Sequence, residues 1–220
     1  MKIEAVIFDM DGVIFDSERL VYQNWLELGP EYGFNSLDTV FYKIIGTNMK
    51  YTEQVFREEY GEDIPYKEFR DKARERYFEH IEIYGIPIKK GVKELLEYLK
   101  GKGYKIGLAS STSIETVTKE LKMSGLYGYF DVIVGGNLIK RSKPEPDIYL
   151  TACNMLGVEP RKAIAIEDSY NGIRAAFAAK MYPIMVPDMV SANDEMIEMA
   201  YKIKSDLIEV KELIEKEFSL

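Results

Sequence analysis

The sequence has few of the side chains that build disulfides or transition-metal centres. Its one cysteine, Cys153, has no partner for an intramolecular disulfide, and it falls in a helical pattern where we expect a small core residue. Its one histidine, His80, is distant in sequence from the acidic motifs described below, and we expect it to be a partly exposed helix residue. A metal centre built from His and Cys ligands is therefore not expected.

Long apolar runs and clustered basic charge are also lacking. No run approaches the ~18 residues that a membrane-spanning helix needs. The 29 Lys and Arg residues face 37 Asp and Glu, and the net charge of −8 argues against a nucleic-acid or anionic-membrane surface. We expect a cytoplasmic protein of 220 residues, a monomer or weak homodimer, that binds neither nucleic acid nor membranes.

The sequence does contain short apolar runs, each followed by a turn and a segment with helical periodicity. The runs cover residues 3–8, 104–109, 131–135, 162–167 and 182–186. They are nearly continuous, as is typical of strands buried on both faces of a parallel sheet. Helix-capping boxes are predicted at Thr112 with Glu115 and at Asp206 with Glu209. The pattern predicts an α/β fold, a doubly wound, Rossmann-like parallel sheet.

One block, residues 17–86, interrupts this alternation with helical periodicity and no buried strand. We predict a catalytic core of residues 1–16 and 87–220 with a helical cap of residues 17–86 inserted after the first strand. The cap holds 14 of the 27 aromatic residues, which we interpret as filling a thin core rather than forming an aromatic pocket. Ser17 is predicted to cap the first cap helix, and linkers 15–17 and 85–90 to act as hinges.

Polar residues follow the predicted strands. Asp9 and Asp11 are two residues apart at the end of the first strand, so both point to the same side if the extended conformation persists, and Gly12 then permits a turn. Ligands bind at the carboxyl ends of such strands. The residues predicted to meet at this edge are Asp9, Asp11, Ser110, Lys143 and Asp168.

The chemistry of these residues is complementary. The carboxylates, with Glu167 counted, would repel one another without a cation, and oxygen ligands of this kind suit Mg²⁺. Lys143, the hydroxyls of Ser110 and Ser111, and the N–H groups of the helix opening near Thr112 suit a phosphate. This combination indicates phosphoryl transfer, in which one carboxylate attacks phosphorus and the other exchanges a proton.

Four ordered segments support a family resemblance. DMDGVIFDSE, LASSTS, SKPEPDIY and IEDSYNGI resemble the motifs of the haloacid dehalogenase-like hydrolases, in the branch that holds phosphoglycolate phosphatase, beta-phosphoglucomutase and sugar-phosphate phosphatases. The motifs span residues 9–172, and the helical block sits where that branch carries its substrate-selecting cap. The resemblance implies the same α/β fold and a Mg²⁺-dependent enzyme.

The resemblance also implies a role for each motif residue. Asp9 would be the nucleophile that forms an aspartyl phosphate, and Asp11 the general acid/base. Ser110 would bind the phosphoryl group, and Lys143 would pair with it and with Asp9. Asp168, helped by Glu167, would bind Mg²⁺ together with the Asp9 carboxylate and the Asp11 backbone carbonyl.

The resemblance leaves the reaction open among three alternatives. The leading hypothesis is a phosphatase that hydrolyses a small phosphorylated metabolite such as a sugar phosphate. A hexose-phosphate mutase of the beta-phosphoglucomutase type is the first rival, although Val21 and Met49 stand where that enzyme has a histidine and an arginine. The second rival is a regulatory or binding protein on the same fold. In the cap, Gly46, Asn48 and Lys43 are candidate substrate contacts.

Overall fold

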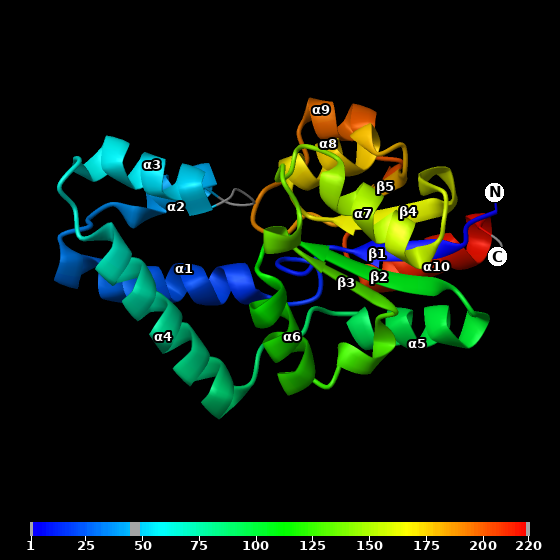
Figure 1. Ribbon diagram of the computed structural model, residues 1–220, viewed down its shortest axis with the longest axis horizontal. Helices are drawn as coiled ribbons and strands as arrows, with labels where there is room; N and C mark the ends of the chain where they lie inside the picture. Colours follow the sequence, from blue (N-terminus) through cyan, green and yellow to red (C-terminus); the bar gives the residue numbers. More distant parts are fainter. Residues whose placement is uncertain (1, 45–48, 219–220) are drawn as a thin grey trace.

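The computed structural model describes residues 2–44 and 49–218, with a parallel sheet in one lobe and a helical lobe beside it (Figure 1). The strands are β1 (Ala5–Phe8), β2 (Lys105–Ser110), β3 (Val132–Gly135), β4 (Ala163–Glu167), β5 (Tyr182–Met185) and β6 (Lys202–Ile203). Within the described residues they form one sheet in the order β3-β2-β1-β4-β5-β6, and every pairing is parallel. The predicted doubly wound α/β fold is confirmed. The prediction missed β6, because two exposed residues form no apolar run.

Helices cover both faces of the sheet. Alternation along β1 sends Val6 and Phe8 into one core and Ala5 and Ile7 into the other. The helices that pack on the Val6 face are α5 (Val92–Lys102), α6 (Ile114–Met123) and α10 (Leu207–Glu217). Those on the Ala5 face are α7 (Asp147–Leu156) and α8 (Tyr170–Ala178), and α9 (Asp194–Met199) contacts α8. Cys153 is buried in α7, as expected.

The second lobe contains the predicted helical insertion. Its helices are α1 (Ser17–Leu28), α2 (Leu37–Ile44), α3 (Met49–Tyr60) and α4 (Tyr66–Tyr84). A short 3-10 turn at Gly29–Tyr32 follows α1 in this lobe. Three further 3-10 turns belong to the lobe with the sheet, at Tyr127–Tyr129, Gly136–Leu138 and Pro160–Lys162. The domain boundaries at residues 16/17 and 86/87 remain a prediction.

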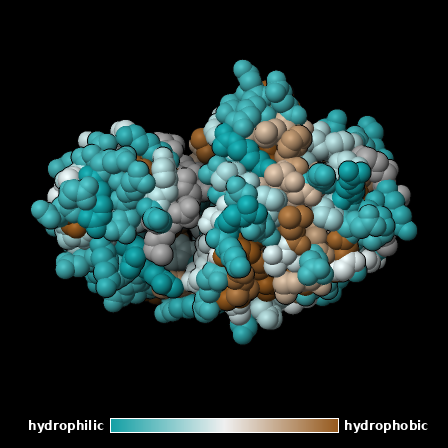
Figure 2. Space-filling model, turned by 45° about the horizontal axis from the view of Figure 1, so that its top comes forward, coloured by the Kyte–Doolittle hydropathy of each residue, from teal (hydrophilic) through white to brown (hydrophobic). Residues whose placement is uncertain are grey.

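The cap aromatics form the centre of this lobe. The centroid of the Phe34 ring lies 5.0 Å from that of Phe69 and 5.3 Å from that of Phe56, and both pairs pack edge to face. All three side chains are buried. The face of the lobe seen in Figure 2 is correspondingly hydrophilic. These three rings therefore form core, as we interpreted them, whereas Trp25, Phe41 and Tyr66 also line the cavity described below.

The two linkers between the lobes lie side by side. The backbone N–H of Asp16 donates to the carbonyl of Pro87 at 2.9 Å, and that of Lys89 donates to Ile14 at 2.9 Å. The pairing fixes where α1 leaves the core and where α4 returns to it. Whether the linkers act as hinges remains a prediction.

The predicted helix caps are correct at one helix and wrong at two. Asp206 caps α10, because its carboxylate accepts from the N–H groups of Ile208 and Glu209 at 2.9 and 3.0 Å. At α6, however, Ser113 and not Thr112 occupies the N-cap position. At α1 the N-cap position belongs to Asp16 and not to Ser17. His80 is exposed on α4, as expected.

Candidate active site

Three adjacent strands bring the predicted polar residues to one edge of the sheet. Ser110 is the last residue of β2, Glu167 is the last of β4, and Asp9 directly follows β1. The Asp9 N–H donates to the Ile166 carbonyl at 2.9 Å, so the pairing of β1 with β4 extends to this aspartate. Asp168 follows Glu167. The carboxylates thus meet at the carboxyl edge, as the strand order requires.

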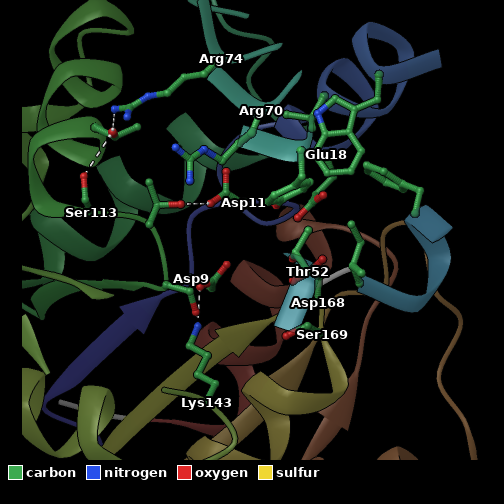
Figure 3. A pocket seen from close by; sticks show the side chains of 18 residues that line it. Asp9, Asp11, Glu18, Thr52, Arg70, Arg74, Ser113, Lys143, Asp168 and Ser169 are labelled. Carbon is green, nitrogen blue, oxygen red and sulfur yellow. Dashed lines mark hydrogen bonds and ion pairs between the residues drawn. The ribbon is translucent and has the colours of Figure 1, made fainter. Parts of the chain in front are cut away.

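Lys143 links two of these carboxylates. Its Nζ lies 2.5 Å from Asp9 Oδ1 and 2.5 Å from Glu167 Oε1, and donates to the Ala109 carbonyl at 3.2 Å. Figure 3 shows Lys143 reaching Asp9 from below in that view. Burial by itself lowers the pKa of Lys143, but the two carboxylates outweigh it and raise that pKa. Lys143 therefore stays charged beside Asp9.

Glu167 is enclosed by hydrogen-bond donors. Its Oε1 also accepts from the Tyr149 hydroxyl at 2.7 Å, while its Oε2 accepts from the Ser169 hydroxyl at 3.1 Å and the Asp168 N–H at 3.2 Å. Gly172 on α8 makes room for this carboxylate, because a Cβ there would lie 1.8 Å from its carbon. The Glu167 side chain is fully buried and holds Lys143 in place.

Burial and mutual repulsion act on the remaining carboxylates. Burial, reinforced by Glu167 and Asp11 and opposed by Lys143, raises the pKa of Asp9 to about 8. Burial and then the charges of Glu167 and Asp9 raise the pKa of Asp168 well above its usual range. Such repulsion is relieved when a cation lies between the oxygens.

Asp11 is oriented by two hydroxyl groups. The Ser17 hydroxyl donates to Asp11 Oδ1 at 2.6 Å, and the Thr112 hydroxyl donates to Oδ2 at 3.0 Å. These are the two residues whose predicted capping roles were wrong. Each hydroxyl donates to a charged acceptor, and such a hydrogen bond is stronger than one between neutral groups. Both residues lie inside the quoted motifs, which associates them with the site but does not identify Asp11 as their partner.

The turn after β1 depends on Gly12. Its φ of +78° is left-handed, and a Cβ would lie 2.2 Å from Asp168 Oδ2. The N–H groups of Ile14 and Phe15 both donate to the Met10 carbonyl, which tightens the turn. Gly12 thereby permits close approach of the β1 turn to Asp168.

The site opens into a cavity of about 460 Å³ between the sheet edge and the cap. Its core side includes Asp9, Asp11, Ser111, Thr112, Ser113, Thr116, Lys143, Asp168 and Ser169. Its cap side includes Glu18, Val21, Trp25, Phe41, Ile44, Thr52, Tyr66, Arg70 and Arg74. Ser110 lies beneath this surface, 1% exposed, and its hydroxyl accepts from the Thr112 N–H at 3.0 Å.

The candidate substrate contacts in the cap are placed differently from those in the core. Gly46 and Asn48 lie outside the described residues. Lys43 is exposed, pairs with Glu59 at 3.2 Å and is absent from the described cavity lining. The residues that do line the cavity from the cap include Glu18, Arg70 and others that the sequence did not single out, because charged residues are frequent throughout these helices.

The acidic residues fit a divalent cation. Asp9, Glu167 and Asp168 each offer a carboxylate oxygen, and these oxygens all lie within 4.8 Å of one another. The set contains oxygen donors alone, which is the ligand chemistry of Mg²⁺. The buried acidic cluster can therefore hold a metal ion, as predicted.

Comparison with known proteins agrees with this site. The haloacid dehalogenase-like hydrolase family matches residues 6–186. The chain is a haloacid dehalogenase-like hydrolase. It lies in the branch of beta-phosphoglucomutase and phosphoglycolate phosphatase, which confirms the predicted family and the prediction of a phosphatase.

Similar proteins match almost the whole chain. The putative phosphatase YhcW of Bacillus subtilis is 34% identical, over 92% of this chain and 92% of its own. The phosphorylated carbohydrates phosphatase of Thermotoga maritima is 34% identical, over 80% and 81%. The crystal structure of a putative beta-phosphoglucomutase from Thermotoga maritima superposes with a TM-score of 0.80 at 28% identity, over 98% of this chain and 100% of that one. Among the described helices of this hydrolase, none has the length and apolar character that crossing a bilayer would take.

Proposed function

We propose that this hydrolase is a Mg²⁺-dependent phosphatase that cleaves a small phosphorylated metabolite through an aspartyl phosphate on Asp9. The observation that carries the proposal is the position of Asp9 at the cavity floor, 2.5 Å from Lys143 and clustered with Asp168. The likeness to a phosphatase of phosphorylated carbohydrates supports a sugar phosphate or a similar substrate.

The first half-reaction transfers the phosphoryl group to Asp9. An Asp9 oxygen attacks phosphorus, the ester P–O bond breaks, and the leaving oxygen takes a proton from Asp11. The hydroxyls of Ser17 and Thr112 hold Asp11 where it faces the cavity. Lys143 contributes positive charge beside the transferring group.

The second half-reaction returns the enzyme to its starting state. Water attacks the phosphorus of the aspartyl phosphate, Asp11 takes its proton, and the P–O bond to Asp9 breaks to release inorganic phosphate. Asp9, Asp168 and the Asp11 backbone carbonyl would hold Mg²⁺, with Glu167 as a further predicted ligand. An ion held by these residues would neutralise charge on the phosphoryl oxygens.

Phosphate release from an aryl phosphate such as p-nitrophenyl phosphate tests the proposal. We expect turnover with Mg²⁺, none after chelation by EDTA, and a loss of at least about 10⁴-fold in kcat for Asp9→Asn. The control is Asp63→Asn, the same change at an exposed cap residue outside the described cavity lining. Undiminished turnover in Asp9→Asn, with its folded state verified by circular dichroism, would contradict the role of Asp9.

A mutase is the second candidate, favoured by the likeness to the putative beta-phosphoglucomutase. Val21, which stands where the mutase has a histidine, is part of the cavity wall. Incubation with beta-glucose 1-phosphate separates the candidates. We expect inorganic phosphate, whereas conversion to glucose 6-phosphate would show a mutase.

A further inference from the structure

Two arginines of the cap face the cavity from one side of α4. Arg70 and Arg74 are four residues apart, so they lie on the same face of the helix, and both line the cavity. Figure 3 shows both side chains extending from α4 toward the side of the cavity that holds Ser113. Lys143 approaches Asp9 from the opposite direction in that view.

Arg74 meets the first turn of α6, whereas Arg70 is paired along its own helix. Arg74 Nη2 donates to the Thr116 hydroxyl at 3.1 Å, and the hydroxyl of Ser113 donates to the same Thr116 oxygen at 3.3 Å. Arg70 Nη2 lies 2.6 Å from the carboxylate of Asp71, the next residue along the helix. Arg74 thus joins the cap to the core through one side-chain hydrogen bond at the cavity wall.

The distribution of charge around the cavity is uneven. Asp11 and Asp168 lie on the core side near Asp9, and Glu18 lines the cavity from the cap. The one lysine of the described lining is already held by Asp9 and Glu167. The positive charge at a distance from the nucleophile comes from the two arginines. Guanidinium forks match the geometry of carboxylate and phosphate groups, and they do so better than a lysine ammonium does.

We propose that Arg70 and Arg74, with the hydroxyls of Ser113 and Thr116, bind a second anionic group at the end of the substrate remote from the scissile phosphate. This inference rests on the proposed function and narrows its substrate class. The substrate is then a phosphomonoester of a hydroxylated carbon chain that carries a carboxylate or a second phosphate at its far end.

Matched pairs of probes test the subsite. Glucitol 6-phosphate and 6-phosphogluconate differ only at C1, which is a neutral hydroxymethyl group in the first and a carboxylate in the second. Fructose 6-phosphate and fructose 1,6-bisphosphate test a second phosphate in the same way. For the full-length enzyme with Mg²⁺ we expect kcat/KM to be at least about tenfold higher for the anionic member of one pair, and which pair responds identifies the anion.

Variants assign the preference to the arginines. Arg70→Gln and Arg74→Gln retain most of the side-chain length, and each is expected to lower the anionic-to-neutral ratio about tenfold. Taking a ratio within each variant cancels general damage to the nucleophile. The control is Arg76→Gln on the same helix, because Arg76 pairs with Glu27 at 2.8 Å and is outside the described cavity lining. Its ratio should equal that of the unmodified enzyme.

Failure of the inference is distinguishable from failure of the proposed function. Suppose that p-nitrophenyl phosphate is hydrolysed but the anionic-to-neutral kcat/KM ratio is near one for both pairs. That result would overturn the subsite alone, and so would a ratio that is unchanged in both arginine variants. If no phosphomonoester is hydrolysed, the proposed function fails. In that case titration calorimetry with the same probe pairs still tests the subsite. The ratio is then taken between the dissociation constants of the neutral and the anionic probe of each pair.

Discussion

The polar side chains of the core and of the cap approach the cavity in different surroundings. In the core, the side chain of Lys143 is 4% exposed and that of Glu167 is fully buried, and each makes several short contacts. In the cap, the Arg70 side chain is 33% exposed. A buried, fully hydrogen-bonded group cannot be exchanged without a large loss of stability, whereas a partly exposed one can. The core is therefore suited to fixed chemistry and the cap to variable selection.

The largest effect on activity in this comparison is expected at Asp11, a core residue that accepts hydrogen bonds from Ser17 of the cap and Thr112 of the core. Asp11→Asn removes the proton donor, so we expect kcat for an aryl phosphate to fall about 10²- to 10⁴-fold. Steady-state kinetics measures it. Thr112→Val, which removes one of the hydroxyls that orient Asp11, should give a smaller loss, and Thr112→Ser should restore activity. Equal activity of the Val and Ser variants would show that the Thr112 hydroxyl does not orient Asp11.

The core of the site was predictable from the sequence because its geometry follows from strand order. Asp9 and Asp168 lie at the ends of apolar runs, and parallel strands must present those ends at one edge. The roles of Ser17 and Thr112 were not predictable in this way, because a hydroxyl near a helix start fits a cap equally well. Distance to Asp11 decides between the two roles, and a sequence does not contain it.

The cap was predictable as a fold but not as a binding surface. Its helices and aromatic core follow from periodicity and composition. Which face of α4 meets the cavity depends on how the helix packs against the core, and Arg70 and Arg74 are two of several basic residues in that helix. Lys43 was an equally reasonable candidate on charge alone, and it lies on an exposed surface with Glu59.

A pair of glycine substitutions tests how tightly the core site is packed. In a helix, Gly→Ala normally stabilises by roughly 0.5–1 kcal/mol. We expect that gain for Gly101→Ala in α5, where a Cβ would have no atom within 4 Å from the rest of the described structure outside its own helical turn. For Gly172→Ala in α8 we expect a loss of about 1–3 kcal/mol, because the new methyl group overlaps the Glu167 carboxyl.

Urea unfolding of both alanine variants measures these free energies. The activity of Gly172→Ala should fall as well, since displacement of Glu167 disturbs Lys143. If Gly172→Ala were as stable as Gly101→Ala, the Glu167 carboxylate would have room to move. The contrast between a rigid core site and an adjustable cap would then be wrong.

The last expected effect depends on pH and lies where the cap meets the core, at Glu120 of α6, which is close to Tyr77 of α4. Glu120 is 2% exposed, and its Oε2 has no hydrogen-bond partner among the described residues. Burial, followed by the charge of Asp11, raises the pKa of Glu120 to about 8 from its usual 4.5. Between these two pH values the folded protein binds more protons than the unfolded chain, so the free energy of unfolding falls as the pH rises.

Glu120→Gln removes that titration and keeps an oxygen for Tyr77 to contact. We expect the variant to be more stable than the unmodified protein at pH 8, by roughly 1–3 kcal/mol, and about equally stable near pH 5. Urea unfolding at the two pH values measures the difference. Glu115→Gln, on the exposed side of the same helix, is the control and should give no gain at pH 8. A gain of equal size at both pH values would trace the effect to packing, whereas a gain confined to pH 8 locates an ionisable carboxylate where the cap closes on the core.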